Sequence, residues 1–280
     1  MSVKVYADSR NRVSGTTEDF VFQIPGSVSL PESLCYIDVA LVPNVFYSCV
    51  AGVNDLLRFA ESTVSGNVTA TVSKQVAIAP GQYNGFTLAE QVQIAMRSVS
   101  AIPSHLTVTY DIAAAKLKID CSDPGGGGVI VFPDGLIHNG VGGWGSYQSV
   151  YPLNTDDTQS AGKLCGFVGD SILQATQGSP ALGDSVIDVQ RHHVLYIHSD
   201  LVAPGSTFGP RGESDIMRRV VIDAPQNGLA IDRFGTSHDS VEVNPRSLKA
   251  MRFTLRGSDG KIVDLRGHHY SFSWVFHEKM

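Results

Sequence analysis

Short runs of alternating apolar and polar residues, rich in β-branched and aromatic side chains, constrain this chain most strongly. Successive side chains on a strand point to opposite faces, so a period of two predicts strands with one buried face. Gly, Pro, Asn and Asp punctuate the runs, as expected for turns between short strands. The runs that predict strands cover residues 20–23, 35–42, 56–59, 68–72, 129–132, 194–198, 220–222, 251–255 and 272–276.

Two features near the carboxyl end sharpen this prediction. Large aromatic residues occupy even spacing at Phe272, Trp274 and Phe276, so they line one face of a strand and would fill a core. The pair Asp259 and Gly260 separates two strand-like segments and readily supplies the positive φ of a tight turn. A hairpin is therefore predicted over residues 255–263.

One amphipathic helix is predicted over residues 87–100. Thr87 and Glu90 have the spacing of a capping box, in which their side chains satisfy orphan amides at the helix start. Pro103 closes the segment. Apolar residues recur at helical spacing, at Leu88, Val92, Met96 and Val99.

Strand-like segments at 76–78, 106–110 and 116–119 flank this helix, which gives a strand-helix-strand-strand module. A Gly-rich stretch with little periodicity follows, from Cys121 to about Gly183, and predicts long, partly ordered loops. We therefore expect a mainly β chain with three parts: residues 1–75 as the first part of a β-sandwich, 76–183 as an inserted module, and 184–280 as the second part of the sandwich.

The composition is that of a globular protein and argues against nucleic-acid-binding and membrane-spanning proteins. The chain has 280 residues, of which 42% are hydrophobic and 17% charged, so it can bury a large core. A net charge of −6 with scattered Lys and Arg argues against nucleic-acid binding. The sequence contains no apolar run of about 20 residues, so no membrane span is predicted. Charged residues come early, at Lys4 and Asp8, which predicts synthesis inside the cell without a secretory signal.

The four cysteines, Cys35, Cys49, Cys121 and Cys165, lie far apart without a Cys-x-x-Cys pair. Neither a zinc site nor a dense disulfide framework is indicated, and buried free thiols are expected.

Catalytic and metal motifs are weak. The adjacent histidine pairs at 192–193 and 268–269 would point to opposite faces of a strand, so neither pair can chelate one ion. His198 and Asp200 have the His-x-Asp spacing of a jelly-roll non-haem iron oxygenase, with His238 or His269 as the distant ligand, but the expected Arg-x-Ser is missing. Gly-x-Ser-x-Gly is also absent from the sequence. We therefore expect no enzyme, cofactor or metal.

A carbohydrate- or receptor-binding β-sandwich is the alternative reading. Trp144, Tyr147 and Tyr151 lie in the Gly-rich region, where their rings could stack on sugars. The competing interpretation for these three side chains is loop packing or a subunit contact.

Segments along nearly the whole chain resemble penton-type minor capsid proteins of polinton-like viruses, adintoviruses, virophages and related double-stranded DNA viruses. The segments that carry the resemblance are 8–12, 19–22, 36–44, 54–56, 80–83, 107–111, 163–167, 195–199, 253–255, 259–260 and 263–265. The similarity lies in the types of residues in these segments and in their spacing along the chain.

This resemblance implies a jelly-roll β-sandwich that forms a homopentamer at the icosahedral vertices of a virion. The implied partners are other copies of the chain, the major capsid protein, and another minor capsid or fibre protein or a host receptor. Such a protein would be non-enzymatic. A fivefold ring requires head-to-tail contacts, in which two different patches of one subunit complement each other.

Overall fold

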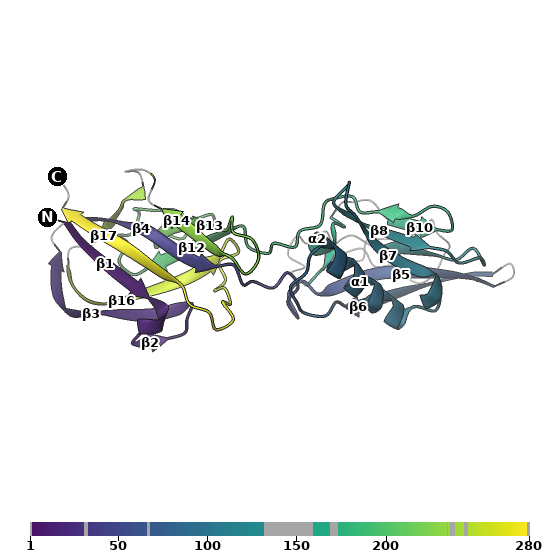
Figure 1. The fold of residues 1–280 in the computed structure, drawn as a ribbon, viewed down its shortest axis with the longest axis horizontal. Coiled ribbons are helices and arrows are strands. Elements are labelled where there is room, and N and C mark those ends of the chain that lie inside the picture. The colour runs from purple at the N-terminus through teal and green to yellow at the C-terminus, as the bar shows by residue number, and fades with distance from the viewer. Residues whose placement is uncertain are drawn as a thin grey trace. The chain divides into compact units, whose positions relative to one another are not determined.

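The computed structural model describes residues 2–30, 33–65, 68–131, 159–168, 173–233, 235, 239–243 and 246–278 (Figure 1). The chain divides into two units, each with its own hydrophobic core. Unit 1 consists of residues 1–46 and 192–280, and unit 2 is the continuous segment 47–191 between them. Unit 2 is therefore an insertion in the sequence of unit 1.

Unit 1 is built from two antiparallel sheets. Sheet A has the order β1 (Ser2–Asp8), β17 (Ser271–Glu278), β4 (Ser33–Pro43) and β14 (Leu229–Arg233), and β15 (Val241–Val243) also pairs with β4. Sheet B has the order β13 (Ile216–Val221), β12 (Val194–Ser199), β16 (Arg246–Gly257), β3 (Asp19–Leu30) and β2 (Ser14–Gly15).

Aromatic side chains join the two sheets of unit 1. Trp274 of β17 contacts Phe22 of β3 edge-to-face, with ring centroids 5.9 Å apart, and Phe253 of β16 lies 4.8 Å from Phe272. Trp274, Phe272 and Phe276 are all buried in one core, as their even spacing predicts. The mainly β architecture confirms the predicted fold class and is consistent with a jelly-roll sandwich.

The predicted turn at Asp259 and Gly260 is confirmed. The amide of Gly260 donates to the carbonyl of Gly257 over 3.0 Å, and the amide of Gly257 donates to Lys261 over 2.9 Å. Gly260 has φ +75°, a conformation that L side chains rarely adopt, which explains why glycine stands at this position.

Unit 2 combines strands with helix α1 (Gly85–Val99), which packs beside β6 and β7. One sheet has the order β10 (Leu173–Thr176), β9 (Gly128–Val131), β5 (Leu56–Ser65) and β6 (Val68–Ala77). The other has the order β11 (Ala181–Leu182), β8 (Lys116–Cys121) and β7 (Leu106–Asp111). The short helices of the described chain are η1 (Ser9–Asn11), η2 (Pro103–His105) and α2 (Gly162–Cys165).

The start of α1 differs from the prediction. The N-cap is Asn84, whose side chain accepts from the amide of Thr87 over 2.9 Å, while the Thr87 hydroxyl accepts from the amide of Asn84 over 2.9 Å. The predicted box of Thr87 and Glu90 is therefore wrong by one turn. Asn84 supplies the earlier cap because its amide oxygen reaches the third helical amide, so the helix begins at Gly85 and not at Thr87.

The unit boundaries also differ from those expected at residues 75/76 and 183/184. Strands β5 and β6 pair with each other and with β9, so they belong to unit 2. In its described parts, the stretch from Cys121 to Gly183, expected to form long loops, contributes β9, α2, β10 and β11 to that unit, while residues 132–158 and 169–172 lie outside the described ranges. Strand β9 overlaps the run predicted at 129–132, whereas β10 and β11 are too short to give a periodic signal, and their partners β9 and β8 lie far away in sequence.

Candidate functional site

The outward-facing side of sheet A carries several exposed or half-buried apolar side chains. Strand β4 buries alternate residues, with Cys35, Ile37, Ala40 and Val42 in the core of unit 1. The register slips between Ser273 and Trp274 of β17, which leaves Asp38 and Val39 of β4 as consecutive half-buried residues. Because the bulge adds one residue, the alternation resumes beyond it and places Leu41 on the same outward side as Val39.

The neighbouring strands continue this apolar surface. Tyr6 of β1 is 70% exposed, and Leu229 and Ile231 of β14 are each 49% exposed. Register brings Ile231 beside Leu41, and Tyr6 pairs with Ser273, which in turn pairs with Val39. We call the set Tyr6, Val39, Leu41, Leu229 and Ile231 the outer face of sheet A. Contiguous apolar surface of this kind marks interaction sites in soluble proteins.

A groove of about 390 Å³ lies in the outer face of sheet A. The outward-facing residues that β17 contributes to the lining are Ser271 and Ser273, so the groove is recessed between the larger side chains of β1 and β4 on either side. The groove thus follows from small residues on a central strand. Its lining includes Tyr6, Asp8, Val39, Leu41, Ser271 and Ser273.

The charged side chains beside the groove are paired within the chain. Lys4 forms an ion pair with Asp38 and lies over the Tyr6 ring, 5.4 Å from its centroid. Arg10 forms an ion pair with Asp8. The hydrogen bond from Arg10 lowers the pKa of Asp8, and the hydrogen bond to Asp38 raises the pKa of Lys4. The positive charges of Lys4 and Arg10 are therefore each compensated by a neighbouring carboxylate.

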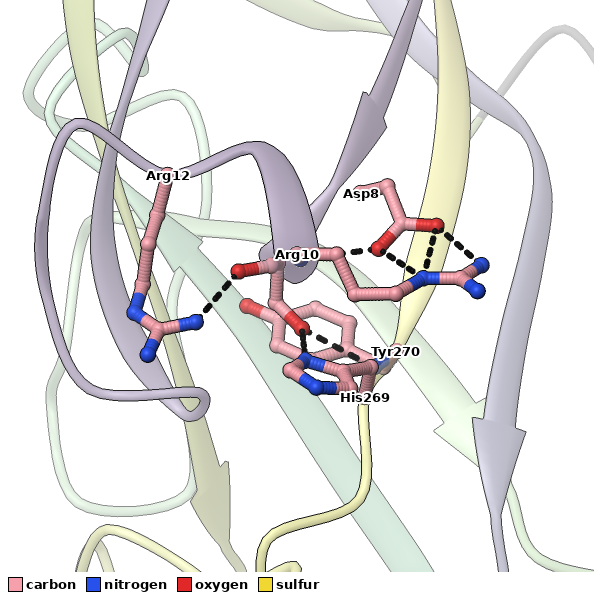
Figure 2. A network of polar contacts seen from close by, with 6 residues as sticks. Asp8, Arg10, Arg12, His269 and Tyr270 are labelled. Atoms are coloured by element: carbon pink, nitrogen blue, oxygen red, sulfur yellow. Dashed lines mark hydrogen bonds and ion pairs between the residues drawn. The ribbon is translucent and has the colours of Figure 1, made fainter.

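A second polar network fixes one end of this surface (Figure 2). Buried Ser9 donates its amide to the carbonyl of Tyr270 over 3.0 Å and accepts from the amide of Tyr270 at its Oγ over 3.3 Å. The same Oγ lies 3.0 Å from Nδ1 of His269, and Arg12 donates to the Ser9 carbonyl over 2.9 Å. These contacts hold η1 against the start of β17.

The contact between Ser9 and His269 has the spacing of a nucleophile and its base. Ser9 is fully buried, however, and its Oγ also accepts from the backbone of Tyr270. The carboxylate of Asp8 is engaged by Arg10. A substrate therefore cannot reach the hydroxyl, and the arrangement is a structural anchor.

The proposed iron ligands do not come together. His198 places Nδ1 2.7 Å from Oδ1 of Asp215, whereas Asp200 accepts from the amide of Arg252 over 3.1 Å, and His269 contacts Ser9. Within the described ranges, no three His, Cys, Asp or Glu residues are grouped to hold a metal ion. His238 lies outside those ranges. The His-x-Asp spacing misleads because Asp215, distant in sequence, is the partner of His198.

The aromatic candidates for ligand contact, Trp144, Tyr147 and Tyr151, lie outside the described residues. The outer face of sheet A was not predicted as a site. Its signal in the sequence is the nearly continuous apolar run at 35–42, because a strand with only one buried face should alternate.

Among the helices of the described chain, none has the length and apolar character needed to cross a membrane. The sequence matches no protein-family model and no curated protein.

The fold does match a solved structure, the crystal structure of the selenomethionine-labelled mavirus penton protein. The TM-score is 0.58 at 8% sequence identity, and the match covers 100% of this chain and 100% of the other. At this identity the likeness concerns the fold. We conclude that this chain has a fold like that of the mavirus penton protein.

Proposed function

We propose that this protein is a non-enzymatic vertex component of a viral capsid, which assembles as a homopentamer and contacts the major capsid protein. The observation that carries the proposal is the full-length match to the mavirus penton protein, in which both chains are covered from end to end. A partial match would support only a shared sandwich, which many unrelated proteins possess.

The surface of unit 1 supports this role. A subunit of a closed ring needs apolar area that is exposed in the monomer and covered in the assembly. The outer face of sheet A has this character, with exposed Tyr6, Leu229 and Ile231. The charges beside its groove are already neutralised by Asp8–Arg10 and Lys4–Asp38 contacts.

Trp144, Tyr147 and Tyr151 remain the candidates for contact with a host receptor or a further capsid protein. Replacement of all three by alanine should reduce attachment of particles to host cells without changing the amount of this protein in purified particles. Loss of the protein from the particles would instead assign these side chains to assembly.

The decisive experiment has two parts. Native mass spectrometry of the purified chain should give a species of five copies of the 30.0 kDa subunit. A reconstruction of particles that carry a tagged chain should place its density at the fivefold vertices. Density at other capsid positions alone would refute the vertex role, whatever the oligomeric state in solution.

A further inference from the structure

A second exposed apolar feature of unit 1 lies in the loop between β12 and β13. Phe208 is 80% exposed, the highest value among the large hydrophobic side chains that the structure describes. A phenylalanine ring exposed to water forgoes the favourable free energy that its burial would contribute. Such a side chain is typical of the anchors that fill pockets on a partner.

Hydrogen bonds hold the loop that carries Phe208. On one side, the amide of Ser206 donates to Ala203 over 3.1 Å, and the hydroxyl of Ser206 accepts from the amide of Glu242 over 2.9 Å. On the other side, the amide of Gly209 donates to the carbonyl of Glu213 over 2.7 Å. The ring is therefore presented from a tied loop, which lowers the ordering cost of binding.

This loop belongs to sheet B, whereas the groove belongs to sheet A. The loop leaves β12 and returns to β13, where the amide of Ser199 donates to the carbonyl of Asp215. Gly209 packs so closely on Ile216 of β13 that an added Cβ would lie 2.5 Å from its Cδ1. Unit 1 thus carries an exposed aromatic side chain on a loop of sheet B and a groove lined in part by Tyr6 on sheet A.

We infer that Phe208 of one copy inserts into the groove between β1 and β4 of the next copy, and that the outer face of sheet A is covered by this contact. Two different patches on one subunit are what a head-to-tail ring requires. Because the charges beside the groove are paired within the chain, burial of apolar surface would provide most of the affinity of this contact. The ring of Tyr6 can pack edge-to-face against the ring of Phe208. This inference rests on the proposed vertex function, because it names the surface through which the copies associate.

Substitutions on the two sides test the contact. Phe208→Ala removes the projection, and Ser271→Trp fills the groove. Each should weaken self-association of the full chain by about 30-fold in concentration-dependent mass photometry, the loss expected for a central anchor. Ile112→Ala, which removes a 71% exposed side chain from unit 2, is the matched control and should leave association unchanged. Thermal melting should show all three variants folded.

Cross-linking tests the same pairing by proximity, at chain concentrations high enough to offset the weaker association expected when Phe208 is replaced. A mixture of Phe208→Cys and Ser271→Cys chains should form an intermolecular disulfide under mild oxidation, whereas either variant alone should not. The native thiols should not interfere, since all four are buried. No cross-link in the mixture, or a wild-type chain that stays monomeric at every concentration, would overturn the inference.

The two proposals can fail separately. Pentamers that form normally with Phe208→Ala would refute this contact and leave the vertex role intact. Conversely, copies that cross-link as expected but lie away from the vertices in particles would refute the vertex role and leave the contact standing.

Discussion

Glu61 is a buried carboxylate that organises the end of α1. Its side chain is 1% exposed and accepts from the hydroxyl of Ser100 and, over 2.8 Å, from the amide of Ala101. It also forms an ion pair with Lys74 of the neighbouring strand β6. Burial alone would raise the pKa of Glu61, but these hydrogen bonds and the ammonium outweigh it and lower the pKa.

Glu61→Gln should destabilise unit 2 by about 1–3 kcal/mol at pH 7, because the amide cannot accept from all these donors. The native pKa lies below the ordinary value of 4.5, so the contribution of the carboxylate is present above pH 4.5 and is lost as the pH falls through the native pKa. Hydrogen exchange of the segment after α1 should show a difference between wild type and variant that shrinks below pH 4.5. Glu90→Gln, on the exposed side of α1, is the control.

The cysteines should be inert in the native protein. Burial raises the pKa of Cys49 to about 11, with a smaller contribution from nearby Asp55, and burial also raises the pKa of Cys35. At pH 8 only about one thousandth of Cys49 would be thiolate, the reactive form. Iodoacetamide at pH 8 should therefore modify the native chain far more slowly than the chain in guanidinium. Equal rates in both conditions would contradict the burial of these thiols.

At the scale of single elements, the cap of α1 gives a direct comparison between two assignments. Asn84→Ala should destabilise the helix by about 1 kcal/mol, since the amide of Thr87 loses its acceptor. Glu90→Ala should have little effect on the stability of the helix, although the sequence motif predicted Glu90 as the capping partner. Exchange rates of the first-turn amides measure both effects. A larger loss for Glu90→Ala would restore the motif-based assignment.

Strand positions were the most predictable feature, because side-chain alternation is local. Residues 272–276 illustrate this, since their aromatic spacing alone predicted which side chains fill the core. Strand partners were not predictable in the same way. Strand β17 pairs with β1 at one end of the chain and with β4 further along, and nothing in a local pattern specifies such distant neighbours.

The candidate site was less predictable than the fold. Its groove arises from the register of three strands, which places Ser273 between Tyr6 and Val39. The ion pair of Lys4 and Asp38 likewise depends on the bulge in β4. Only the apolar run at 35–42 carried a local signal. Site geometry that depends on pairing cannot be obtained before the pairing is known.

At the scale of the whole molecule, the two cores share no residues, so the units should lose structure separately. Phe253→Ala removes a fully buried ring from unit 1 and should cost that unit about 3–5 kcal/mol. Exchange mapped along the full chain should accelerate in β16 and β17 but not in α1.

Phe59→Ala is the matched change in unit 2, where the ring is equally buried, and should give the reverse pattern. Acceleration throughout the chain for either variant would show that the units unfold as one cooperative body.

The pairing of β1 with β17 has a consequence for biosynthesis. Unit 2 is one continuous segment, so all its strands have been made once residue 191 leaves the ribosome. Sheet A instead cannot be completed until residues 271–278 have been synthesised, because β17 lies between β1 and β4. Domains can fold during translation, but the groove has no central strand until translation has passed β17. A nascent or prematurely terminated chain therefore lacks the surface through which we propose that copies recognise each other. The proposed contact can form only after β17 has been synthesised, so this order of synthesis would delay assembly until the chain is nearly complete.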